Sequence, residues 1–351
     1  MEITIDNIKT ALSKVVEPDL NKDIITLGLV DKINAEHNFI TFSVKVSNPA
    51  MHSKKRMEEA CEFALERAFG KDVKSNITVE ALPKDRDPTI RTILPNVKHI
   101  IAVASGKGGV GKSTITTNLA AGLAKKGFKV GLVDADIYGP SAPTMFDLVG
   151  QRPDGVEMNG KTLIKPLESH GVKILSIGFF SDPDQAVVWR GPMATKALNQ
   201  MFKDAHWGDL DYLLIDLPPG TGDIHLTLVQ NIPLTGAIIV STPQEVALAD
   251  ARKGINMFKM DTLKVPVIGL VENMAWFTPA ELPENKYYIF GQDGAKNLAE
   301  SMNVPLLAQI PLVQSMREAG DVGRPAVLQD NTPSSVIFDE FVETVIKNVE
   351  A

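Results

Sequence analysis

The sequence contains almost no cysteine, since Cys61 is the only thiol among 351 residues. An intrachain disulfide is therefore impossible, and so is a metal site built only from the cysteines of one chain. No apolar run approaches the roughly 20 residues that a membrane helix needs. The first residues, MEITIDNIKT, include acidic side chains and no apolar run, unlike a signal peptide. We expect a cytoplasmic protein without a membrane partner.

The chain also lacks an excess of positive charge, because its formal net charge is −7. A negative balance argues against generic nucleic-acid binding by a basic surface, and we expect no nucleic-acid partner. The length allows one large domain or two unequal ones.

Residues 83–97 form a stretch rich in proline and charge without clean periodicity, which predicts a linker. The preceding residues, 1–82, contain two helical patterns and three strand-like runs, which predict a small α+β domain. One of these strands is expected at 24–33, and a turn at 34–37.

Residues 98–351 alternate helical patterns with short, uninterrupted, β-branched apolar runs. Strands buried on both faces have this composition and belong to parallel sheets. The prediction is a doubly wound, mostly parallel α/β sheet whose ligands bind at the carboxyl ends of the strands. The seven runs are HIIAVAS, KVGLVDAD, VKILSIG, DYLLIDLPP, TGAIIVSTP, VPVIGLVEN and PLLAQIP.

A glycine-rich loop, GKGGVGKS, lies between a predicted strand and a predicted helix. It fits the phosphate-loop pattern G-x-x-x-x-G-K-[ST], and this strand–loop–helix context supports the match. Glycines let backbone N–H groups crowd around phosphate oxygens, while Lys112 would reach the outer phosphates and Ser113 would ligate Mg²⁺. The alternative is a glycine-rich turn without a ligand. The predicted ATP contacts here are Gly106, Lys107, Gly108, Gly109, Val110, Gly111, Lys112, Ser113 and Thr114.

The additional lysine, Lys107, resembles the signature of the deviant Walker A ATPases, the class that contains MinD and ParA. The resemblance implies a homodimer with ATP at its interface, in which Lys107 reaches the partner's nucleotide and acts in catalysis beside Lys112. A cation delivered in this way would offset charge on the transferring phosphoryl group. The alternative is a solvated loop lysine.

Three aspartates follow predicted strands. By resemblance to the same family, Asp136 positions or activates the attacking water, Asp134 helps to organise Mg²⁺, and Asp216 holds Mg²⁺ as the Walker B carboxylate. Gly220 would supply a backbone N–H that senses the γ-phosphate. The alternative for each aspartate is a strand-end cap or turn.

Adenine recognition is assigned by resemblance to Asn273, with Ile310 and Pro311 flanking the base. An amide can pair with the adenine edge as donor and as acceptor. The alternative is a structural turn asparagine.

Longer strings narrow the resemblance. DADIYGPSAPTMF, WRGPMATKALNQM, DLPPGTGDIHLTL and IFGQDGAKNLAE resemble the Mrp/ApbC branch, the iron–sulfur cluster carrier ATPases, over about residues 97–345. The first 82 residues resemble the domain often fused ahead of these ATPases, which also occurs in iron–sulfur assembly factors. The implied activity is ATP-dependent binding and transfer of an iron–sulfur cluster to apoproteins, or help in its assembly.

The chain departs from this branch in its cysteines. Family members carry a C-x-x-C pair that supplies thiolates to a bridging cluster, and no cysteine lies between Glu272 and Gly291 here. Cys61 is expected to be a buried packing thiol, since it lies on an apolar helical face. Cluster ligands would then come from His52, carboxylates, a partner's cysteines or a small thiol.

Segment 274–290 contains four aromatic residues beside two prolines, which favours either a docking surface or packing within the protein. A second function stays open: a nucleotide-switched scaffold or positioning ATPase of the MinD/ParA type, without a metal role. A metabolic ligase or kinase with the same loop is a third.

Overall fold

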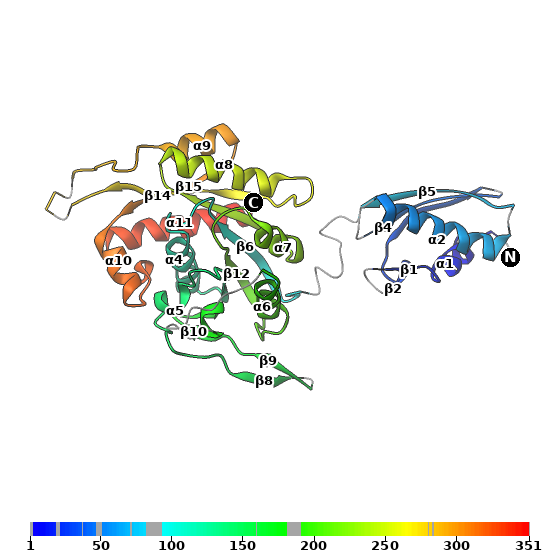
Figure 1. Cartoon of the computed structure of the whole chain (residues 1–351), viewed down its shortest axis with the longest axis horizontal. Helices are drawn as coiled ribbons and strands as arrows, with labels where there is room; N and C mark the ends of the chain where they lie inside the picture. Colours follow the sequence, from blue (N-terminus) through cyan, green and yellow to red (C-terminus); the bar gives the residue numbers. More distant parts are fainter. Residues whose placement is uncertain are drawn as a thin grey trace. The chain divides into compact units, whose positions relative to one another are not determined.

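A computed structural model of the chain describes residues 3–18, 22–36, 38–46, 51–70, 72–81, 93–158, 160–180, 191–279, 281–282 and 284–350 (Figure 1). The chain divides into two compact units, Met1–Ile93 and Leu94–Ala351. Most of the predicted linker, residues 83–92, lies outside the described residues, as do the side chains of Met51 and His52.

The first unit is a three-stranded sheet with two helices. Its middle strand β4 pairs antiparallel with β3 and parallel with β5. Cys61 and the other apolar side chains of the helices join those of the sheet in one buried core. The elements are α1 (Ile5–Leu12), β1 (Val16–Glu17), β2 (Lys22–Asp23), β3 (Val30–Glu36), β4 (Phe39–Val46), α2 (Met51–Phe69) and β5 (Lys74–Ala81).

The first long strand begins at Val30, later than the expected residue 24, and it continues into the expected turn. Asp23 explains the delay, because its Oδ1 accepts hydrogen bonds from the N–H of Ile25 at 3.1 Å and of Thr26 at 2.8 Å. This side-chain turn takes over backbone donors that a sheet would otherwise use.

The second unit is built on an eight-stranded sheet in the order β10-β11-β7-β12-β6-β13-β14-β15. All neighbours are parallel except β10, which runs antiparallel to β11. The predicted fold is confirmed: a small α+β unit precedes a doubly wound α/β unit in the sequence. The strands are β6 (Val97–Ala104), β7 (Val130–Asp134), β10 (Leu167–Ser169), β11 (Val172–Ser176), β12 (Leu210–Asp216), β13 (Gly236–Ser241), β14 (Val267–Phe277) and β15 (Leu306–Leu312).

Helices cover both faces of this sheet. Figure 1 shows α8 and α9 on one side of its β13–β15 half and α4 and α11 on the other. The helices are α4 (Lys112–Lys125), α5 (Ala142–Met145), α6 (Gly191–Lys203), α7 (Asp223–Asn231), α8 (Glu245–Lys259), α9 (Gly294–Met302), α10 (Gln314–Asp321) and α11 (Pro333–Glu350), with 3₁₀ turns η2 (Ile177–Phe180) and η3 (Ala326–Leu328). None of the described helices is long and apolar enough to span a bilayer.

The sequence did not predict the edge strand β10 or the separate hairpin of β8 (Gly155–Met158) and β9 (Lys161–Ile164). The turn between β10 and β11 consists of His170 and Gly171, whose φ angles are 50° and 76°. Two positive φ angles suit a tight hairpin turn, but histidine at the first position is an uncommon signal for it.

Strand β6 is the point from which the sheet extends in both directions. Strands β12 and β7 lie on one side of it and β13 lies on the other. In the strand register Asp216 lies opposite Asp134 of β7 and opposite Val103 of β6. The sheet therefore brings the two strand-end carboxylates together, beside the loop that follows β6, which is where doubly wound sheets bind ligands.

Candidate nucleotide-binding site

The glycine-rich loop joins β6 to α4, as its sequence predicts. Gly109 and Gly111 have φ angles of 83° and 82°, in the left-handed region that glycine enters without a steric penalty. Gly111 is the N-cap of α4, so the positive end of the helix faces the loop. Lys107, Gly108 and Gly109 are exposed.

Two glycines of the loop lie against other parts of the site. A Cβ on Gly106 would come within 2.2 Å of the carbonyl carbon of Asp250 in α8, and one on Gly111 within 2.1 Å of Nδ2 of Asn273. A Cβ so close to its neighbours does not fit, so Gly106 needs glycine for space, and Gly111 needs it for space and for its left-handed conformation.

The second lysine of the motif is buried and surrounded by carboxylates. Nζ of Lys112 lies 2.8 Å from Oδ1 of Asp216 and 3.8 Å from Oδ2 of Asp136, and only 6% of its side chain is exposed. A cation in so dry a place needs anions close by. These two carboxylates provide them in this structure.

Asp216 also binds two hydroxyl groups of α4. Oγ of Ser113 donates to its Oδ2 at 2.5 Å, and Oγ1 of Thr116 lies 2.9 Å from its Oδ1. The structure therefore brings together the hydroxyl and the carboxylate that the sequence assigned to magnesium. Thr116 was missed by the motif, although its spacing of four residues from Lys112 places both on one helical face.

Asp134 is fully buried in a cage of donors. Its Oδ1 accepts from the N–H of Asp136 at 3.2 Å, and its Oδ2 accepts at 3.0 Å each from the N–H groups of Ser141 and Ala142 and from Oγ of Ser176. Burial, followed by the charge of Asp216, raises the pKa of Asp134 to about 7 against the effect of these donors. Asp134 thus fixes the start of α5 next to the loop.

Asp136 lies at the other side of Lys112. Its Oδ1 accepts the N–H of Gly139 at 3.3 Å. Burial raises the pKa of Asp136, the charge of Lys112 lowers it, and Asp216 raises it again. Burial has the largest effect, and a carboxylate whose pKa is raised is better suited to accept a proton from water.

Asn273 is buried at the far end of the loop. Its Nδ2 donates one N–H to the carbonyl oxygen of Val110 at 2.8 Å, which leaves the second N–H as a donor and Oδ1 as an acceptor. Both Asn273 and Pro311 line a cavity of about 580 Å³ that opens beside Gly111 and Thr114. A volume of this order is typical of a small-ligand site.

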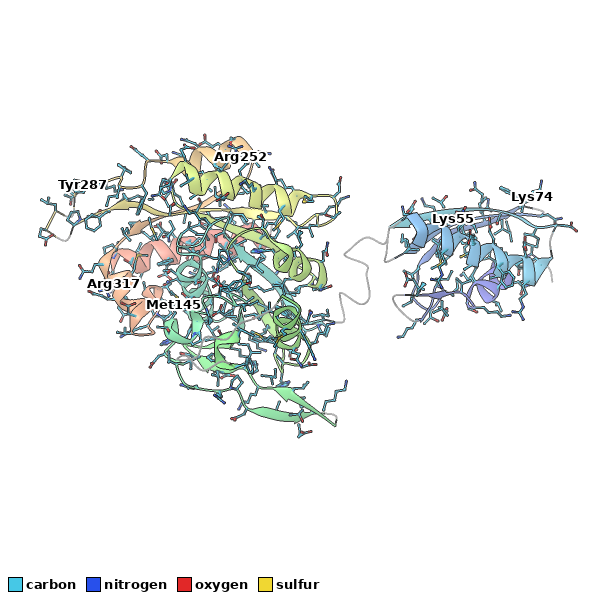
Figure 2. All side chains as sticks on the ribbon, in the orientation of Figure 1. Lys55, Lys74, Met145, Arg252, Tyr287 and Arg317 are labelled. Atoms are coloured by element: carbon cyan, nitrogen blue, oxygen red, sulfur yellow. The ribbon has the colours of Figure 1, made fainter. Side chains whose placement is uncertain are left out.

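Walls of this cavity come from the loop, α4, α5, the end of β15 and α10. Met145 of α5 and Arg317 of α10 are labelled close together in Figure 2, and both line the cavity. Apolar side chains predominate, with threonine hydroxyls at one side. The other lining residues are Thr117, Asn118, Gly139, Pro140, Ser141, Thr144, Met274, Leu312, Val313, Met316, Gly320, Asp321, Pro325 and Ala326.

Gly220 and Lys107 lie at the open side of the loop. The N–H of Gly220 donates to the carbonyl oxygen of Ser105 at 2.9 Å, so it is engaged by the protein itself here. Lys107 makes no ion pair with the described part of the chain. Its exposed ammonium is therefore available to bind an anionic group of another molecule.

His225 of α7 is a buried residue that the sequence did not single out. It is 2% exposed, and its Nε2 has no hydrogen-bond partner among the described residues. Burial, and then the charge of Lys112, lowers the pKa of His225 to about 4. The imidazole is therefore neutral near pH 7. Only its place nine residues after Asp216 could have drawn attention to it.

Thiolate chemistry is absent from this region. Cys61 belongs to the first unit, is fully buried, and burial raises the pKa of its thiol to about 12. Such a thiol is inert at neutral pH. Within the described ranges, no cluster of three or more histidine, cysteine or acidic side chains is arranged to hold a metal ion.

Comparisons with known proteins match each unit of the chain to a family. Residues 96–347 match the family described as ParA, the NUBPL iron-transfer P-loop NTPases, and residues 5–79 match the iron–sulfur cluster assembly protein family. The iron–sulfur cluster carrier protein of Synechocystis sp. is 42% identical over 334 residues, 95% of this chain and 94% of that protein.

Similar solved structures include two nucleotide-bound proteins. A nucleotide-binding protein in complex with ADP from Archaeoglobus fulgidus has 37% identity and a TM-score of 0.60, over 71% of this chain and 94% of that one. The septum site-determining protein MinD complexed with Mg-ADP from Pyrococcus horikoshii has 25% identity and a TM-score of 0.50, over 72% and 99%. The chain belongs to the ParA family of NUBPL iron-transfer P-loop NTPases.

Proposed function

We propose that the protein is an ATP-hydrolysing homodimer that promotes delivery of iron–sulfur clusters to apoproteins in the cytoplasm. The observation that carries the proposal is the full-length similarity to a cluster carrier together with the buried Lys112–Asp216–Ser113 group beside a glycine-rich loop. The MinD/ParA scaffold alternative is not favoured, because the MinD protein is 25% identical over 72% of this chain, whereas the cluster carrier is 42% identical over 95%.

ATP would bind along the loop from Gly106 to Thr114. Backbone N–H groups and the N-terminus of α4 receive the phosphates, and Lys112 exchanges its contact with Asp216 for one with the phosphates. Ser113 and Asp216 would hold Mg²⁺, because a hydroxyl and a carboxylate 2.5 Å apart are hard oxygen ligands already in place. The ion would neutralise phosphate charge. Asp134 supports this site indirectly by fixing α5.

Asn273 and Pro311 would recognise adenine. One N–H of Asn273 is held by Val110, so the amide offers its second N–H and its Oδ1 to the base. A donor beside an acceptor suits the edge of adenine, which presents ring nitrogens and an amino group. The apolar walls suit a flat ring.

Hydrolysis would depend on Asp136 and on Lys107 of a second copy. Asp136 lies next to Lys112 with a raised pKa, which suits a group that orients and deprotonates water. The exposed Lys107 would stabilise charge on the partner's transferring phosphoryl group. Gly220 would exchange its bond to Ser105 for one to the γ-phosphate. This exchange would link nucleotide state to the shape of the dimer.

The cluster is the cargo, and this chain offers it few ligands. A dimer has two thiols, both buried Cys61, whereas a [4Fe–4S] cluster takes four thiolates. We propose that the acceptor or an assembly partner supplies the cysteines while this ATPase controls the encounter.

The test is an anaerobic activation assay of an apo-enzyme that needs a [4Fe–4S] cluster, with iron, sulfide and the full-length protein. We expect Mg-ATP to accelerate activation, and Cys61→Ala to behave as the wild type. Activation that is indifferent to both protein and ATP would reject cluster delivery and leave a nucleotide-binding protein of another role.

A further inference from the structure

The mouth of the nucleotide cavity is formed by one face of α10, which the functional assignments above do not use. Met316, Arg317, Gly320 and Asp321 of this helix line the cavity. Met316 is buried, whereas Arg317 is 62% exposed, so the apolar side chain lies inside and the guanidinium at the rim.

The guanidinium of Arg317 is paired with two carboxylates of its own helix. Its Nη1 donates to Asp321 at 2.5 Å and its Nη2 to Glu318 at 3.1 Å, while Gln314 donates to Glu318 at 2.7 Å. Two contacts on different nitrogens define the plane of the group, which a single contact would leave free to rotate. In this structure the rim therefore carries a planar cation whose plane is set by contacts within α10.

We infer that Arg317 covers the outer face of the adenine ring of bound ATP and contributes to base affinity. The inference rests on the proposed ATP site. Asn273 and Pro311 line the inner part of the same cavity, so a base that reaches Asn273 lies between them and α10. A guanidinium over an aromatic face is attracted by the ring electrons, and its flat shape stacks where an ammonium does not.

The competing explanation is that these residues only stabilise the surface of α10. Ion pairs and hydrogen bonds between exposed side chains of one helix contribute little to stability. Replacing Arg317 would then change the stability of α10, but it would not weaken binding of ATP more than binding of tripolyphosphate. This difference defines the experiment.

Binding of Mg-ATP and of Mg-tripolyphosphate to the full-length protein would be measured by calorimetry for wild type, Arg317→Ala and Arg317→Lys. We expect Arg317→Ala to weaken ATP binding by about 2- to 30-fold and to leave tripolyphosphate binding unchanged, with Arg317→Lys in between. Arg252→Ala is the matched control, because Arg252 is an exposed arginine of α8 that contacts Met302 and does not line the cavity.

Three outcomes would overturn the inference: wild-type ATP affinity in Arg317→Ala, an equal loss for ATP and tripolyphosphate, or the same loss in Arg252→Ala. A wild-type protein that binds neither ligand would instead refute the proposed nucleotide site. Normal ATP binding with no cluster delivery would refute only the proposed cargo.

Discussion

Two glycines of the phosphate loop have left-handed backbone conformations. Replacing each with alanine separates the cost of backbone strain from the cost of a steric clash between the new Cβ and its neighbours. Gly109 and Gly111 have φ angles within one degree, but only Gly111 has a neighbour within 4 Å of a new Cβ. Gly109→Ala therefore measures the cost of the conformation, which is about 1–2 kcal/mol for alanine. Gly111→Ala adds a second cost.

That second cost comes from Asn273. A Cβ at 2.1 Å from its Nδ2 forces the amide away and breaks its 2.8 Å hydrogen bond to the carbonyl of Val110. A buried polar group left unpaired costs about 1–3 kcal/mol, and overpacking a similar amount. We expect Gly111→Ala to destabilise the second unit by about 2–6 kcal/mol more than Gly109→Ala.

The assay is urea unfolding of the full-length protein followed by tryptophan fluorescence. All three tryptophans, Trp189, Trp207 and Trp276, belong to the second unit, so the signal reports the unit that carries the loop. The same pair of variants in an Asn273→Ala background should differ by no more than about 0.5 kcal/mol, the usual limit of additivity. Equal costs for the two glycines, or a gap that persists without Asn273, would refute the reasoning.

Three other expected results concern single side chains. Lys107→Ala should keep Mg-ATP binding and lose hydrolysis, measured by calorimetry and phosphate release; full turnover would contradict a role in trans. His225 has a folded-state pKa of about 4, below its ordinary 6.5, so the stability that its neutral form provides is lost as the pH falls from 6.5 to 4. His225→Gln should remove this loss, about 3 kcal/mol at most, from urea unfolding curves across that range; an unchanged pH dependence would be inconsistent with it. Cys61→Ala should destabilise the first unit by about 1–2 kcal/mol in thermal unfolding and leave iron transfer intact. Loss of transfer in this folded variant would give the thiol a chemical role.

The sequence predicted the seven parallel strands of the second unit because each is an uninterrupted apolar run, the pattern of strands covered on both faces. Short edge pieces such as β10 carry too few residues to show a period, and their pairing depends on a His170–Gly171 turn that the composition does not announce. The start of β3 was missed because one side chain, Asp23, redirected the backbone.

The sequence predicted those residues of the site that belong to short local motifs. Ser113 and Asp216 lie more than 100 residues apart, and their 2.5 Å contact follows once β12 is placed between β6 and β7. The orientation of Asn273 could not be predicted, because it is set by Val110, 163 residues away. Thr116 and His225 belong to no motif, and only burial beside Lys112 and Asp216 reveals them.

The central physical claim is that the glycine loop, Lys112, Ser113 and Asp216 together hold magnesium and ATP. Isothermal titration calorimetry of the full-length protein with ATP, with and without Mg²⁺, tests it most directly. We predict one ATP bound per chain, with an affinity that requires Mg²⁺ and is lost in Lys112→Ala. The absence of magnesium-dependent ATP binding in the wild type, or equal affinity in Lys112→Ala, would contradict the account.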